Sequence, residues 1–142
     1  HPLQRLRAVR ALADAGVEVG VLMAPIVPGL TSQPAKIERT IKAIADHGAR
    51  FCGGMVMHLE GGTRDHFMRF LSEEFPELAP RVNRLYAGKY APAAYRKQVQ
   101  GVMNLMRRRY GLQTKEKRTS TPKPAHGRVN SVEAAPRFRW SA

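Results

Sequence analysis

The stretch that decides the fold runs from Val19 to Ala49 and reads VGVLMAPIVPGLTSQPAKIERTIKAIADHGA. It opens with a continuous apolar run, which is typical of a parallel strand, because helices then cover both faces of the sheet. A Pro-Gly turn follows, and Ile37, Ile41 and Ile44 then recur at helical spacing. This order predicts a strand, a turn and a helix, with the strand buried on both faces and the helix burying its isoleucine stripe.

The flanking residues extend this unit into an alternating α/β pattern. Residues 3–16 place apolar side chains at helical spacing, and residues 17–27 contain the first strand. Residues 49–59 predict a second strand that is apolar on both faces. Each of the first two helices ends at a glycine, Gly16 or Gly48, the residue that most often follows a helix.

The turn between the first strand and the second helix contains the signals of a helix start. Thr31 or Ser32 can cap the helix with its hydroxyl, and Pro34 suits its first turn. We therefore expect the helix to begin within a few residues of Gly29.

After the second strand the pattern becomes helical. Residues 61–75 predict a helix with Thr63 as its N-cap, residues 77–88 a shorter one, and residues 93–111 a long one. From Gln113 onward Pro, Ser, Thr, Lys and Arg dominate without periodicity. We expect residues 113–142 to be a disordered basic tail.

Composition limits the class of protein. The 142 residues hold 24 Lys and Arg against 11 Asp and Glu, a net charge of +13, which favours anionic partners. The single cysteine, Cys52, excludes an internal disulfide and a metal site of the CxxC type. There is no secretory signal and no apolar run of about 18 residues. We expect a cytoplasmic protein with no membrane contact.

Two strands make an incomplete sheet, because both outer edges of a two-stranded parallel sheet stay unpaired. One interpretation is that the chain is the C-terminal end of a larger α/β sheet or barrel. The other is a small α/β domain completed by homo-oligomerisation. The pattern favours the first interpretation.

Four segments carry a resemblance to a known family: RLRAVRALADAGVEVGVLMAPIVPGL, DHGARFCGGMVMHLEGGTRDHFMRFL, FPELAPRVNRLY and GKYAPAAYRKQV. Over about Arg5 to Leu112 the chain resembles the C-terminal half of bacterial radical SAM proteins of the spore-photoproduct-lyase-like group. The combination of APIVPGL with HL before TRDHFMRFL is its most specific part.

The resemblance implies an α/β fold belonging to a partial (β/α)6 radical SAM barrel. Residues 1–62 would be its last two β/α units, residues 63–112 a C-terminal helical segment, and residues 113–142 the tail. The full-length parent would be a lyase-like enzyme that generates a 5′-deoxyadenosyl radical from S-adenosylmethionine (SAM). A CxxxCxxC motif upstream would hold its [4Fe-4S] cluster. This chain lacks that motif, so we expect it to be inactive alone, without cofactor, and to need the missing N-terminal half.

The same resemblance places five residues on the SAM side of the parent. Pro25, Val27, Pro28 and Gly29 end the first strand, where two prolines fix φ and a glycine frees the turn. His58 ends the second strand. A tight turn without any ligand explains the first four residues equally well. No catalytic residue and no metal ligand is assigned within this chain.

Three further features have a structural and a functional interpretation. Glu60 either hydrogen-bonds a ribose or pairs with Arg64, and His66 has no metal-site spacing. The tyrosines around Lys89 either stack on nucleic acid or lie at the rim of a helical junction. Five methionines are expected in the core: Met55, Met57, Met68, Met103 and Met106.

The alternative function is a non-enzymatic, basic nucleic-acid-binding module. Seven basic residues in the tail predict weak, salt-dependent contact with phosphates. The apolar parallel strands and the lack of a helix-turn-helix or zinc pattern argue against this alternative. The substrate of the enzyme interpretation stays unknown.

Overall fold

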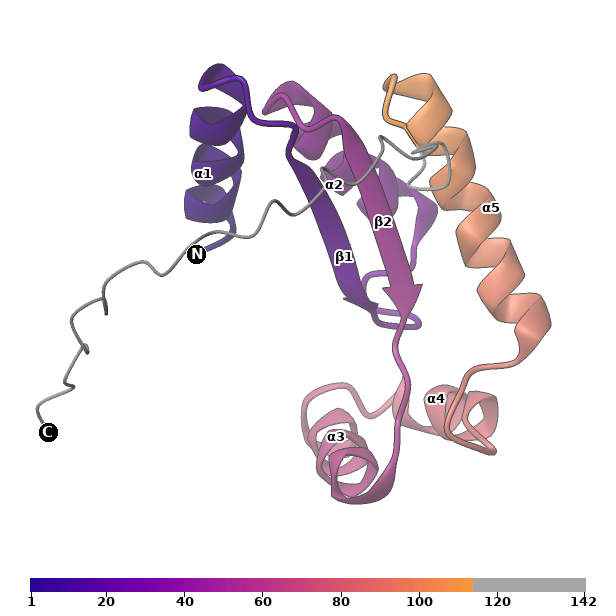
Figure 1. Ribbon diagram of the computed structural model, residues 1–142. Helices are drawn as coiled ribbons and strands as arrows, with labels where there is room; N and C mark the ends of the chain where they lie inside the picture. Colours follow the sequence, from indigo (N-terminus) through magenta and orange to yellow (C-terminus); the bar gives the residue numbers. More distant parts are fainter. Residues whose placement is uncertain (114–142) are drawn as a thin grey trace, which may run out of the picture.

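The computed structural model describes residues 1–113. The elements follow the expected order, with limits close to those predicted (Figure 1): α1 (Pro2–Asp14), β1 (Gly20–Ile26), α2 (Pro34–Asp46), β2 (Phe51–Val56), α3 (Gly61–Glu74), α4 (Ala79–Leu85) and α5 (Ala93–Arg109). The tail predicted from Gln113 lies outside the described residues, apart from Gln113 itself, which bridges to Phe51. No helix in the described part is long and apolar enough to cross a membrane.

The two strands form a parallel sheet. Their register runs from Gly20 opposite Phe51 to Met23 opposite Gly54 and shifts before the end of the strands. Figure 1 shows α2 behind the sheet, α5 alongside β2, and α3 and α4 beyond the ends of the strands. Helix α5 packs against both α2 and β2.

The expectation that this chain folds as part of a (β/α)6 barrel is wrong. Residues 1–113 form an open, two-stranded sheet with five helices, and they contain no barrel. A barrel closes only when enough tilted strands meet edge to edge. The apolar runs of this chain supply two strands, which is too few to curve back on themselves.

The expectation that both strands are buried on both faces is also wrong. In β2, Cys52 and Val56 are buried, whereas Met55 between them is 55% exposed. In β1, Leu22 is 67% exposed. Helices α2 and α5 cover one face of the sheet, so burial alternates with the two-residue period of a strand. An apolar sequence shows that a face can be buried, but not that something covers it.

The core lies between the sheet, α2 and α5. The predicted stripe of α2 is confirmed, because Ile37 and Ile41 have no exposed surface and Ile44 is 1% exposed. Of the methionines expected in the core, Met57, Met103 and Met106 are buried, Met68 is half-buried and Met55 is exposed. The stripe is confirmed because the helical period places all three isoleucines on one side.

The helices end at the predicted glycines, but the predicted N-cap residues do not cap the helices. Gly16, Gly48 and Gly111 follow helices at positive φ, and Pro34 begins α2, as predicted. The residue before α2 is Gln33, without a capping side chain, and α3 begins at Gly61 after Glu60, so Thr63 is not its cap. The expected caps close the preceding turn instead: the Thr31 hydroxyl accepts from Val27 N, and the Ser32 hydroxyl from Gly29 N.

A small helical lobe, α3 and α4, is tied to the end of the sheet. Arg64 on α3 donates to the Tyr86 carbonyl over 2.6 Å and to the Asn83 side chain over 3.1 Å. The buried Tyr86 hydroxyl donates to the Met57 carbonyl just after β2, over 2.6 Å. These bonds hold the lobe beside the carboxyl ends of the strands.

Candidate functional site

An apolar pocket lies where β1 and β2 end and α3 begins, with a volume of about 380 Å³. We call it the strand-end pocket. In open α/β sheets ligands bind outside the carboxyl ends of the strands, so its position is that of a binding site. It is lined by Ala24, Pro25, Met55, Val56, Met57, His58, Leu59, Thr63 and Phe67.

The strand-end pocket brings together two of the five predicted site residues, Pro25 and His58. The other three lie in the turn after β1. The Val27 carbonyl accepts backbone hydrogen bonds from the amides of residues 30–32, and Pro28 is buried. Gly29 has φ +77°, and a Cβ there would lie 3.1 Å from Leu78. In the structure these three residues shape the turn and do not line the pocket.

Backbone bonds on both sides fix the segment that carries His58. Met57 N donates to the Ile26 carbonyl over 3.0 Å, and Leu59 N donates to the Lys89 carbonyl over 2.8 Å. His58 and Tyr90 form an isolated antiparallel bridge. The exposed His58 side chain is therefore presented at the pocket mouth by a backbone that is bonded to two separate parts of the chain.

Sequence reasoning missed seven of the nine residues that line the pocket, among them Met55, Thr63 and Phe67. Thr63 and Phe67 are four residues apart in α3, so they share a helix face. That spacing could have indicated from the sequence that the two side chains act together. Met55 was expected in the core, and it lines the pocket because its face of the sheet carries no helix.

An ion pair that was not predicted begins one residue after Leu59, which lines the pocket. Glu60 pairs with Lys89, which lowers the pKa of the Glu60 carboxyl and raises that of the Lys89 ammonium, mainly through their hydrogen bond. The suggested pairing of Glu60 with Arg64 is wrong, because Arg64 is bound to α4. Both partners of the observed pair are exposed, so we expect it to add little stability.

Next to this pair, Tyr90 is 54% exposed. The Lys89 ammonium lies 5.6 Å from the centre of its ring, and the Arg96 guanidinium carbon 5.7 Å. Arg96 is held by a bond from its Nε to the Ala91 carbonyl, 3.1 Å long. The exposed ring and its two cations form a surface suited to an aromatic or anionic group.

The described residues offer no place for an iron–sulfur cluster. No group of three or more His, Cys, Asp or Glu side chains comes together in residues 1–113. Cys52 is 1% exposed, and burial raises its pKa to about 11 despite the nearby Arg107 charge. A thiol of this kind stays protonated at neutral pH and does not act as a ligand.

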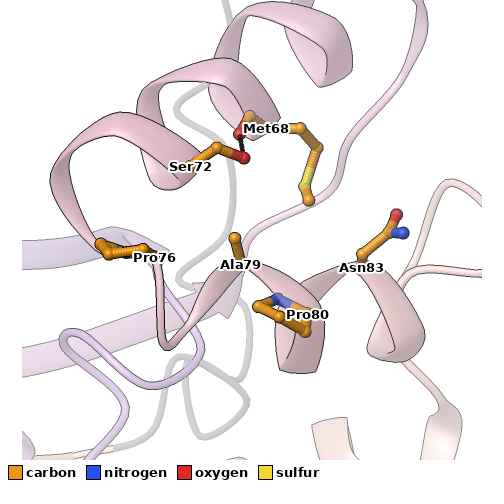
Figure 2. Close-up of a pocket in the computed structure, with 6 residues that line it drawn as sticks. All are labelled: Met68, Ser72, Pro76, Ala79, Pro80 and Asn83. Atoms are coloured by element: carbon orange, nitrogen blue, oxygen red, sulfur yellow. Dashed lines mark hydrogen bonds between the residues drawn. The ribbon is translucent and has the colours of Figure 1, made fainter.

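A second pocket, of about 430 Å³, lies between α3 and α4 (Figure 2). Within its lining the Ser72 hydroxyl donates a hydrogen bond to the Met68 carbonyl, one turn earlier in α3. It is lined by residues of the helical lobe and by no ionisable side chain, whereas the strand-end pocket is lined by residues from both strand ends and by His58, which favours the strand-end pocket as the site. It is lined by Met68, Ser72, Pro76, Ala79, Pro80 and Asn83.

Comparison with known proteins shows relatives without an assigned function. Uncharacterized proteins of Mycobacterium bovis and Mycobacterium tuberculosis are 36% identical to this chain over 96 residues. The match covers 67% of this chain and 28% of each relative, so the chain spans about a quarter of the length of the relatives it matches. No protein-family model matches the chain, and no solved structure gives a significant match.

Proposed function

We propose that this chain is part of a radical SAM enzyme and that its strand-end pocket holds the adenosine end of SAM. The proposal rests on the resemblance of residues 5–112 to that class and on the pocket at the carboxyl ends of both strands. The observation that carries it is the meeting of Pro25 and His58 in that pocket. Pro25 lies in β1 and His58 follows β2, and the resemblance assigns each to the SAM side without reference to a contact between them.

The lining suits a flat aromatic ring. Pro25, Met55 and Phe67 offer apolar surface to the faces of an adenine, whereas His58 and Thr63 supply polar groups at its edge. SAM would supply one-electron chemistry, and the protein's part is to position it and to exclude water. Residues 1–113 do not fit the [4Fe-4S] cluster, so in this proposal the cluster ligands belong to another part of the enzyme.

We expect Phe67→Ala to raise the KM for SAM about tenfold in the full-length enzyme, which corresponds to ~1.4 kcal/mol of lost binding. The substitution removes the aromatic wall of the pocket. The measurement is the anaerobic formation of 5′-deoxyadenosine against SAM concentration. Phe70→Ala is the matched control, because Phe70 lies on the same helix, is 41% exposed and does not line the pocket. Equal KM values for the two variants would contradict the assignment of the pocket.

The enzyme class has a separate test in the gene. Reading the coding DNA upstream of the His1 codon should show an in-frame CxxxCxxC. A start codon near His1 with no such motif nearby would remove the enzyme proposal and leave the pocket without this ligand.

The exposed Tyr90 surface favours one alternative, a basic module that binds single-stranded nucleic acid. Base stacking on an aromatic side chain is worth ~1–3 kcal/mol, so on this alternative Tyr90→Ala weakens binding of a thymidine oligonucleotide about tenfold. Tyr90→Phe keeps the ring and retains affinity. Fluorescence anisotropy over a range of salt concentrations measures both variants. If Tyr90→Ala and Tyr90→Phe bind the oligonucleotide with equal affinity, the Tyr90 ring does not contribute to binding.

A further inference from the structure

A short bulge near the end of β1 carries two of the residues that line the strand-end pocket. The register of the sheet shifts between Met23 and Ile26, where three steps along β1 correspond to two along β2. The segment inside this shift is Ala24 and Pro25, and both residues line the pocket. Bulges are common beside binding sites, where they re-aim a side chain. The position of Pro25 therefore depends on how the chain is held on each side of the bulge.

The turn that follows the bulge is held together by its own side chains. Val27 N donates to the Thr31 hydroxyl over 2.8 Å, and Gly29 N donates to the Ser32 hydroxyl over 3.0 Å. The Gln33 side-chain amide donates to the Gly29 carbonyl over 3.2 Å. Each of these bonds joins residues three or four positions apart. They fix the shape of the turn, but they do not fix its place against the rest of the fold.

A hydrogen bond from α5 ties this turn to the core. The Tyr95 hydroxyl donates to the Ser32 hydroxyl over 2.9 Å, across 63 positions of sequence, and the same Ser32 oxygen accepts from Gly29 N. Tyr95 is half-buried and packs against the core. Its neighbour Tyr86 donates to the Met57 carbonyl just after β2. The two tyrosines thus hold the chain after β1 and the chain after β2, on either side of the strand-end pocket.

We propose that Tyr95 is a positioning residue of the strand-end pocket. Through Ser32 it fixes the place of the turn after β1, and the turn fixes the bulge that presents Pro25 to the ligand. A wall that is already fixed lowers the cost of ordering the site when a ligand binds. Tyr95 does not line the pocket, so it acts through these residues and not by contact. Its effect on SAM rests on the proposed function, whereas its effect on the turn does not.

The first test is amide hydrogen exchange of the full chain, followed by mass spectrometry over residues 26–32. Tyr95→Phe should make this segment exchange about tenfold faster, because its local opening no longer breaks the bond to α5. Tyr110→Phe is the matched control, since the Tyr110 hydroxyl also donates over 2.9 Å at a part-buried site, but to Glu38 on α2. Equal exchange of residues 26–32 in the two variants would overturn the proposal.

The second test is the steady-state kinetics of the full-length enzyme, from anaerobic formation of 5′-deoxyadenosine. Tyr95→Phe should raise the KM for SAM about fivefold at unchanged kcat, an effect of the size expected for one hydrogen bond. A purely structural defect would instead lower the fraction of active enzyme, and therefore kcat, at unchanged KM. Ser32→Ala should raise the KM at least as much. Adding Tyr95→Phe to it should change the KM no further, because the two side chains act as one chain of bonds.

The two tests separate a failure of this proposal from a failure of the proposed function. If exchange is faster in Tyr95→Phe while its KM for SAM equals that of Tyr110→Phe, the turn moves without affecting the pocket, and the proposal is wrong. If the unsubstituted enzyme shows no saturable use of SAM, the proposed function fails. The exchange measurement then decides by itself: faster exchange supports the role of Tyr95 in holding the turn, and unchanged exchange overturns it.

Discussion

Replacing Tyr86 with alanine is expected to lower the free energy of unfolding by about 3–5 kcal/mol, the range for removing a buried aromatic side chain. Tyr86 has no exposed surface and lies where the helical lobe meets the sheet. Its hydroxyl donates to the Met57 carbonyl, and its own carbonyl accepts from Arg64. Urea unfolding followed by circular dichroism measures the loss.

Tyr86→Phe isolates the hydroxyl from the ring. It should cost about 1–3 kcal/mol, because the buried Met57 carbonyl loses its hydroxyl donor. Tyr110→Phe is the control, since the Tyr110 hydroxyl bonds to the Glu38 carboxylate at a partly exposed site. We expect a smaller loss there. If Tyr86→Phe unfolds at the same urea concentration as the unsubstituted chain, the hydroxyl does not hold the lobe.

Because the pKa of Tyr86 is raised in the folded state, the free energy of unfolding should depend on pH in the alkaline range. Burial, and then the neighbouring Tyr95, raise the pKa of Tyr86 to about 12 from its ordinary value of 10. The unfolded state releases the phenol proton first, so this stabilisation is complete below pH 10 and is lost between about pH 10 and 12. In Tyr86→Phe the free energy of unfolding should therefore fall less between pH 10 and 12 than in the unsubstituted chain, as measured by urea unfolding at each pH.

Ile41→Ala is expected to cost about 2–5 kcal/mol, and Ile41→Val about 0.5–1.5 kcal/mol. Ile41 has no exposed surface and lies in the middle of the α2 stripe, in the core. Removing three carbons leaves a cavity that the close-packed helices can fill only in part.

Thermal unfolding of the two variants beside Thr40→Ala measures this effect. Thr40 directly precedes Ile41 in α2 and is exposed, so its substitution should shift stability by about 0.5 kcal/mol at most. Equal stabilities of Ile41→Ala and Thr40→Ala would show that the stripe does not form the core.

The candidate site was predictable in part. Pro25 and His58 close predicted strands, and the ends of parallel strands meet at one edge, so local pattern and the resemblance were enough to bring them together. Phe67, Met55 and Tyr86 were missed as parts of the site or its support. Their roles depend on where α3 and α4 lie against the sheet. That arrangement is decided by contacts between residues more than twenty positions apart, such as Arg64 with Tyr86.

The sequence by itself determined the order of the elements, the glycines that follow the helices and the isoleucine stripe of α2. Each of these follows from interactions within a few residues: a helical period, a positive φ, a proline in a first turn. Only the tertiary structure decided that residues 1–113 form a two-stranded sheet and not a barrel, and that Leu22 and Met55 are exposed. An apolar residue carries the same letter whether or not another element covers it, because burial is a property of the contact between two surfaces and not of either one alone.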